Sequence, residues 1–258
     1  MKPIFNIILL SICLQLAFTN ATAAQKMIKI DKQLKENSQP MVVKRKGMSV
    51  IGKYEFGPYK VISGKSGWEK VSTRSPLFGD HTSINSSTKK SFVFVNKTAD
   101  TCIANIQIVE NIETDDGNWF SRTFLNWSDS EVKKGEGVFE TVFTFSADTI
   151  PWKLTVVYPA FVEVQDGYIK RDTITNFRGM LTDTNTFIEI KKVTLREDGK
   201  SPLFNPVIGY EFWQGSKSLA AVQVLPINRM YVWIRDDLEA PLKFILANSA
   251  VAMLIKDF

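Results

Sequence analysis

The chain has 258 residues, of which 44% are hydrophobic and 23% are charged, and its formal net charge is +5. This composition is typical of soluble globular proteins, so it argues against wholesale disorder and against a polytopic membrane protein. With only two cysteines the chain has no disulfide-based scaffold, and its stability must come from a packed core.

The first 23 residues have the pattern of a secretory signal peptide. Lys2 gives a positive start, residues 4–18 are mostly apolar, and Ala21 and Ala23 fit a small-residue cleavage site. The apolar run is shorter than the roughly 20 residues needed to span a bilayer. We expect cleavage after Ala23 and export to the periplasm or the extracellular space; an uncleaved anchor is the alternative.

Residues 24–40 are predicted to form a flexible basic leader ahead of a single domain over 41–258. Residues 24–65 hold ten Lys or Arg against three acids, with Lys44-Arg45-Lys46 as the densest cluster. Such a cluster suits an anionic lipid surface or a polyanionic glycan, and a merely solvated segment is the alternative. Export and the lack of a recognition motif argue against nucleic acid.

From about Met41 onward, short runs rich in β-branched and aromatic residues alternate with Gly, Asn, Asp and Pro. This pattern predicts many strands joined by turns. Their spacing of roughly 8–12 residues is typical of an all-β barrel or sandwich. The clearest runs in chain order are Ser91–Asn96, Cys102–Ile112, Val138–Phe145, Trp152–Val157, Phe161–Ile169, Thr186–Thr194, Val207–Trp213, Leu219–Leu225 and Arg229–Ile234.

Residues 237–255 are predicted to form a C-terminal helix, with Asp236 and Asp237 suited to its positive end. At 100° per residue its apolar positions surround the whole helix, and its polar interruptions are Lys243, Asn248 and Ser249. A helix that is apolar all round is buried on every side or lies in a membrane. The segment is short for a bilayer, so we predict a core helix inside a protein shell, with a membrane tail as the alternative.

This arrangement resembles a known superfamily. The stretch Ile208-Gly209-Tyr210-Glu211-Phe212-Trp213-Gln214-Gly215, then Ala220-Ala221-Val222-Gln223, Val232-Trp233-Ile234 and the terminal helix are similar to the C-terminal part of tubby-like proteins, a group that includes LURP-one-related proteins and phospholipid scramblases. The resemblance covers about fifty residues. It implies a mainly β fold, a closed antiparallel barrel of about twelve strands around a buried C-terminal helix; a β-sandwich is the alternative.

The resemblance implies less about function than about fold. Cytosolic members of the superfamily bind phosphoinositide lipids through basic residues on the barrel surface, but no basic motif here maps onto that site. We therefore carry over the fold and no functional residue. A helix that fills the barrel leaves little room for a large ligand inside, so binding is expected on the outer face or at the rim loops.

Residues suited to catalysis are few. His81 is the only histidine, and after cleavage Cys102 is the only cysteine, which excludes the usual Cys/His zinc sites. There is no Gly-x-Ser-x-Gly motif, phosphate loop or dinucleotide fingerprint. We predict no catalytic residue, metal ion or cofactor, and we expect Cys102 to be buried as a small hydrophobe.

Acidic and aromatic residues leave one further possibility open. An acidic turn at Asp115-Asp116 is followed by Trp119 and Trp127, and Trp68 lies in another Gly-rich turn. Exposed indole rings stack on sugars or insert at lipid interfaces, whereas rings in strands more often pack into a core.

Two functions follow from the sequence. The first is an exported, non-enzymatic binding or structural protein that meets an anionic membrane surface through Lys44, Arg45 and Lys46. The alternative is a carbohydrate-binding module or glycosidase that uses Trp119 and Trp127.

Overall fold

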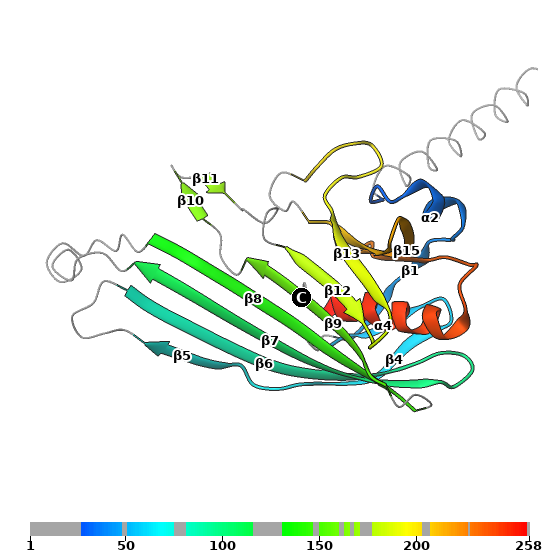
Figure 1. The fold of residues 1–258 in the computed structure, drawn as a ribbon, viewed down its shortest axis with the longest axis horizontal. Helices are drawn as coiled ribbons and strands as arrows, with labels where there is room; N and C mark the ends of the chain where they lie inside the picture. The colour runs from blue at the N-terminus through cyan, green and yellow to red at the C-terminus, as the bar shows by residue number, and fades with distance from the viewer. Residues whose placement is uncertain are drawn as a thin grey trace, which may run out of the picture.

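The computed structural model describes residues 27–47, 51–74, 81–115, 131–146, 150–159, 163–165, 168–170, 177–202, 207–226 and 228–256. The elements in these ranges are shown in Figure 1. In chain order they are α2 (Lys32–Glu36), β1 (Met41–Val42), β2 (Lys44–Lys46), β3 (Lys53–Phe56), β4 (Tyr59–Ser66), β5 (Lys70–Arg74), β6 (His81–Val95), β7 (Thr101–Asp115), β8 (Glu131–Phe145), β9 (Trp152–Pro159), β10 (Glu163–Gln165), β11 (Tyr168–Lys170), β12 (Arg178–Thr182), β13 (Phe187–Val193), β14 (Gly209–Gln214), β15 (Lys217–Gln223), β16 (Tyr231–Ile234) and α4 (Ala240–Lys256).

One large antiparallel sheet forms most of the fold. Its strands follow the order β1-β16-β15-β14-β13-β12-β9-β8-β7-β6-β4-β3-β2, and β5 pairs with β6 off this path. The path starts and ends in the same chain segment, because only Val43 separates β1 from β2. Residues 41–42 pair with β16 and residues 44–46 pair with β3, which nearly closes the sheet into a barrel.

The barrel agrees with the sequence prediction. If residues 41–46 are counted as one interrupted strand, the described part of the barrel has twelve strands. Closure removes the exposed sheet edges that would otherwise pair with other chains. The run predicted over Phe161–Ile169 differs in detail, since it contains the separate hairpin β10–β11 instead of one strand.

Helix α4 lies within the wrapped sheet, as Figure 1 shows. Twelve consecutive residues of this 17-residue helix, 244–255, are buried. The predicted core helix is therefore confirmed, and a sandwich with an external helix is excluded. The two buried polar residues bond to the helix's own carbonyls: Asn248 Nδ2 donates to Phe244 O at 2.8 Å and Ser249 Oγ donates to Ile245 O at 2.9 Å.

The helix begins at Ala240 and not at the expected residue 237. The carboxylate of Asp237 accepts hydrogen bonds from Nε and Nη2 of Arg235, at 2.8 and 2.9 Å. It is also 3.2 Å from the ammonium of Lys217. The Glu239 carbonyl accepts the first helical bond, from the Lys243 N–H at 3.0 Å. Asp237 is thus bound by side chains outside the helix and does not start it.

Residues 27–40 were expected to form part of a flexible leader, but the structure packs them against the outside of the barrel. Ile28 is 1% exposed and Leu34 is fully buried, and both belong to a small core cluster with Trp233. Asp31 caps α2 by accepting from two of its backbone N–H groups. The segment is ordered because these apolar side chains, which the charge count overlooks, cover the outer face of β15 and β16.

Three neighbouring strands extend beyond the barrel. β6, β7 and β8 have 15 residues each, and Figure 1 shows them projecting past α4 together with β5. Near α4 their inward side chains are fully buried, as at Phe94 and Phe143. Along residues 83–88 of β6, by contrast, every side chain is partly exposed. The projection therefore presents two accessible faces and carries the candidate site described next.

Candidate functional site

The outer face of strands β2 to β6 is strongly basic. Residues 44–47, 51–74 and 81–95 together hold ten Lys or Arg and two Glu. Residues directly opposite each other in an antiparallel pair share one face of the sheet. Phe92 and Phe94 of β6 point into the core, so the odd-numbered residues of β6 and their partners point outward. Eight exposed cations lie on this outward side, here called the basic face: Lys44, Lys46, Lys53, Lys60, Lys65, Lys70, Arg74 and Lys89.

The predicted trio Lys44-Arg45-Lys46 is divided between the two sides of β2. Lys44 and Lys46 are exposed on the basic face, and Lys46 Nζ is 3.1 Å from the Glu55 carboxylate. This contact holds the pKa of Glu55 below its usual range, chiefly through the hydrogen bond from Lys46. Arg45 points to the other side, where its guanidinium lies over the ring of Tyr54. The side-chain period of two residues in a strand imposes this division.

Trp68 is the most exposed large apolar side chain in the described part of the chain. Its side chain is 93% exposed, and it lies between β4 and β5, two strands that both pair with β6. The Gly67 N–H donates to the Lys89 carbonyl at 2.7 Å. A Cβ at position 67 would lie 2.8 Å from that oxygen, so a side chain there would collide with β6. Glycine thus permits the segment that carries Trp68 to approach the backbone of β6 closely at Lys89.

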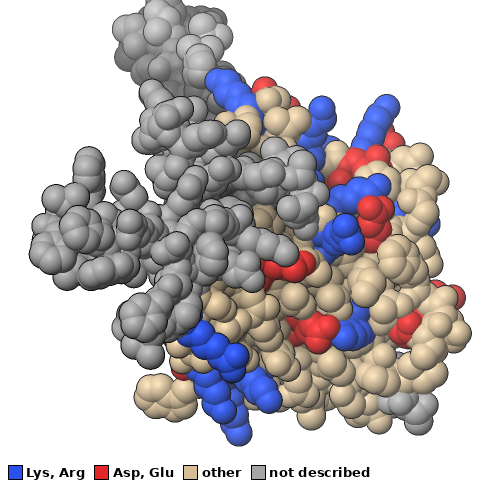
Figure 2. Space-filling view, turned by 60° about the vertical axis from the view of Figure 1, so that its left-hand side comes forward, with Lys and Arg blue, Asp and Glu red and all other residues tan. Residues whose placement is uncertain are grey.

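Exposed basic and apolar side chains lie on both sides of Trp68 in the sequence, and the exposed acid Glu69 follows it directly. Lys65 lies three residues before it and Lys70 two residues after it, and both belong to the basic face. Two further apolar residues of β4 and β5 are exposed, Ile62 at 46% and Val71 at 60%, and Val71, paired with Ser86, points to the side opposite Lys70. In Figure 2, where the projecting end of the sheet comes forward, Lys and Arg side chains gather at its lower edge. Trp68, Lys65, Lys70 and Lys89 are here called the Trp68 cluster.

The other residues that the sequence analysis singled out do not belong to the Trp68 cluster. Trp119 and Trp127 lie outside the described residues, as does Asp116. Cys102 is fully buried, as expected, and burial raises the pKa of its thiol to about 12. His81 is the first residue of β6.

The sequence prediction missed most of the Trp68 cluster. Lys65, Lys70 and Lys89 are separated in the sequence, so no local charge count brings them together. Alternation from the buried Phe92 and Phe94 could have placed Lys89 on an outward position of β6. For Lys65, alternation from the buried Tyr59 and Val61 predicts the inward side, and the register shift between Val61 and Ser63 turns it outward. That they share a face with Lys70 follows only from the register of β4 and β5 against β6.

A cavity lies at one end of the barrel, beside the first turn of α4. Its volume is about 430 Å³, and its walls include Phe145, Trp152 and Phe244. The cavity is thus at the rim of the barrel and not in the part that α4 fills.

Comparisons of the chain with protein-family models, curated proteins and solved structures find no match. In the described part of the chain, no helix combines the length and apolar character required to cross a membrane. The described ranges also contain no group of three or more His, Cys, Asp or Glu side chains placed to hold a metal ion.

Proposed function

We propose that this protein is a non-enzymatic binding protein that attaches peripherally to an anionic membrane surface through the Trp68 cluster. The observation that carries the proposal is the 93% exposure of the Trp68 side chain between Lys65 and Lys70. A soluble protein gains no folding stability from an indole in water. An indole at the headgroup level of a bilayer, flanked by lysines, gains both apolar contact and attraction to anionic lipid.

The basic face adds a broader electrostatic contribution. Each Lys or Arg near an anionic leaflet contributes about 1 kcal/mol to binding. Among the described residues of β2 to β6, the basic side chains are opposed only by Glu55 and Glu69, and Glu55 is already paired with Lys46. The face therefore carries a strong excess of positive charge. The predicted signal peptide fits this role, because an exported chain meets the outer side of a membrane.

The proposal is tested by sedimentation with liposomes. We would use residues 24–258, because residues 1–23 contain an apolar run that would itself bind lipid and all the described contacts lie within 27–256. Binding is expected to anionic vesicles and not to neutral ones, and to weaken as salt screens the exposed charges. W68A should lower the affinity about tenfold, since burial of a large apolar side chain contributes about 1.5–3 kcal/mol.

Charge reversal provides the second test. K65E/K70E/K89E should weaken binding at least 100-fold, at about 1 kcal/mol for each lysine removed. A matched control is K29E/K32E/K200E, which changes the net charge equally at three exposed lysines outside the basic face. F187A controls for W68A, because Phe187 is also 60% exposed but lies on β13. Equal losses in test and control variants would contradict a defined site.

A second candidate function is carbohydrate binding. The exposed indole of Trp68 is also suited to stacking on a sugar ring, and this observation favours it. The two functions differ in their salt dependence, because stacking on a neutral sugar needs no counter-charge. Binding to a neutral polysaccharide that W68A abolishes and K65E/K70E/K89E leaves unchanged would replace the membrane proposal with this one.

We also propose kinship with the tubby-like superfamily. It is supported by the twelve-stranded arrangement around a buried C-terminal helix, which the sequence resemblance predicts. A shared fold does not by itself imply a shared ligand, so the membrane proposal is based on the Trp68 cluster and the basic face and not on the superfamily.

A further inference from the structure

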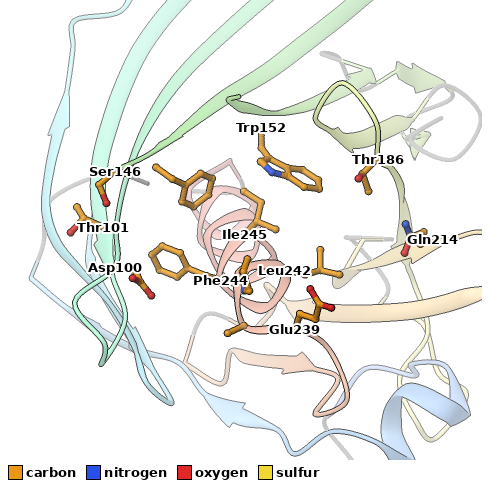
Figure 3. Close-up of a pocket in the computed structure, with 13 residues that line it drawn as sticks. Asp100, Thr101, Ser146, Trp152, Thr186, Gln214, Glu239, Leu242, Phe244 and Ile245 are labelled. Carbon is orange, nitrogen blue, oxygen red and sulfur yellow. The ribbon is translucent and has the colours of Figure 1, made fainter. Parts of the chain in front are cut away.

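The cavity at the end of the barrel has a structural cause. Helix α4 begins at Ala240, so it fills the barrel only from its first turn onward. Beside that turn, Phe145 of β8 and Trp152 of β9 face inward at the end of the barrel and form a wall together with the first residues of α4. They enclose a space of about 430 Å³, the size of a small-molecule site. Figure 3 shows this space between Trp152, Ile245 and Leu242.

Aromatic rings form the apolar wall of the cavity. Phe145 and Phe244 meet edge to face, with ring centroids 5.7 Å apart and an angle of 62° between their planes. Phe244 is also stacked on Phe94 at 5.7 Å, which holds its ring in place. Trp152 comes from the first position of β9 and is partly exposed. The wall thus consists of rings fixed by the barrel core, of which Phe145 and Trp152 are partly exposed and Phe244 is buried.

The charges at the cavity are all negative. Its 13 lining residues include Asp100 and Glu239 but no Lys, Arg or His. In Figure 3 these two acidic residues lie on opposite sides of the first turn of α4. Asp100 Oδ2 accepts hydrogen bonds from Asn96 Nδ2 at 2.7 Å and from Thr98 Oγ1 at 2.8 Å. These bonds lower the pKa of Asp100, so its carboxylate carries a charge at neutral pH.

The start of a helix usually attracts anions, but this one is poorly suited to do so. Pro241, the second helical residue, has no N–H to donate. The carboxylate of Glu239 stands at the same end and offsets the positive end of the helix dipole. An anionic ligand would therefore meet two carboxylates and a reduced set of donors, whereas a cation with an apolar body meets opposite charge and an aromatic wall.

We propose that this cavity binds a small organic cation with an apolar body, such as an arylalkylammonium ion. The aromatic wall of Phe145, Trp152 and Phe244 receives the apolar body, and Asp100 and Glu239 attract the ammonium group. The site is separate from the Trp68 cluster and does not depend on a membrane.

Calorimetry with two ligands of similar shape tests the proposal. We would titrate the protein, without lipid, with 2-phenylethylammonium chloride and with neutral 2-phenylethanol. The ammonium ion should bind at least tenfold more tightly than the alcohol, and salt should weaken only the ammonium binding. D100N/E239Q should remove this preference and leave the alcohol affinity unchanged. W152L should weaken both ligands.

Three outcomes would overturn the proposal. They are equal affinity for the two ligands, tighter binding of the alcohol, or no binding of either at millimolar concentration. Asp100 and Glu239 are exposed, so their amide variants should keep the fold, which thermal unfolding checks. If a variant did unfold, the salt dependence of the unmodified protein would still decide between a charged and a purely apolar site.

Discussion

The guanidinium carbon of Arg45 lies 5.9 Å from the centroid of the Tyr54 ring, although Arg45 stands between two lysines that face solvent. A Cβ on Gly52 would lie 2.6 Å from Arg45 Nε, so the side chain occupies space that only a glycine leaves free. Burial raises the pKa of Tyr54 to about 12, and the nearby positive charge partly opposes this shift. Arg45 is therefore part of the packing of the barrel, and its two neighbours are part of the basic face.

This division predicts that substitutions at adjacent positions have different effects. R45A should lower the free energy of unfolding by about 1–2 kcal/mol, because it removes packing and a cation–ring contact. It should leave lipid binding nearly unchanged. K44A/K46A should weaken lipid binding and change the stability by less than about 0.5 kcal/mol. Urea denaturation and liposome sedimentation measure the two effects, and a loss of lipid binding in folded R45A would contradict the division.

Glu211 predicts a specific dependence of stability on pH. It is 8% exposed under residues 27–38, and its Oε1 accepts from the Asp31 N–H at 2.7 Å. Burial raises its pKa above the ordinary 4.5, against the effect of that hydrogen bond. The folded state thus holds the proton more firmly than the unfolded state. The stabilisation that comes from the protonated Glu211 is therefore fully present below pH 4.5, and it declines as the pH rises through the raised pKa.

E211Q isolates this contribution. The difference in unfolding free energy, variant minus unmodified protein, should become more positive between pH 4 and pH 7, because glutamine avoids the buried charge. Chemical denaturation at several pH values measures it. A difference that stays constant with pH would show that Glu211 ionises as easily when folded as when unfolded.

For Asp237, the dependence of stability on pH should have the opposite sign to that for Glu211. Hydrogen bonds from Arg235 and attraction to Lys217 lower its pKa below the ordinary 3.8. Its stabilising contribution is present above pH 3.8 and is lost as pH falls toward the lowered pKa. D237N should therefore be less stable than the unmodified protein at pH 7, and the deficit should shrink below about pH 4. The same denaturation series checks this, with E211Q as the comparison of opposite sign.

Cys102 should be unreactive while the protein is folded. It is fully buried, and its thiol pKa is raised to about 12 by burial. In residues 24–258, where it is the only cysteine, an aromatic disulfide reagent at pH 8 should react slowly in buffer and rapidly in denaturant. Rapid reaction under native conditions would show that the strand around Cys102 opens readily.

Gly137 makes room for Tyr158 across two paired strands. A Cβ at position 137 would lie 2.9 Å from the Tyr158 hydroxyl oxygen, and that hydroxyl donates to Glu110 Oε1 at 2.7 Å. G137A should destabilise the protein by about 1–3 kcal/mol by overpacking. Y158F alone should cost about 1 kcal/mol. In the double variant the two losses should not add, and strict additivity would show that the alanine leaves the hydrogen bond intact.

Much of the barrel could be predicted from local patterns. The apolar residues around the whole of α4 indicated burial on every side. The many predicted strands indicated that a β-sheet surrounds the helix. The leader was judged from its charge, and the two apolar anchors Ile28 and Leu34 were too few to show that it packs on β15 and β16. The helix start was misplaced because Arg235 and Lys217 bind Asp237, and neither contact has a signature in the sequence.

The residues of the candidate sites were even harder to predict from local sequence patterns. The alternation in each strand, set by the backbone, determines which residues point to one side together. It does not determine which strand lies alongside or in what register. The pairing of β4 and β5 with β6 decided that Gly67, the neighbour of Trp68, lies against the backbone of Lys89. The start of α4 inside the barrel decided that Asp100 and Glu239 line one cavity. Pairing and register depend on contacts distant in the sequence, so only the tertiary structure brings these side chains together.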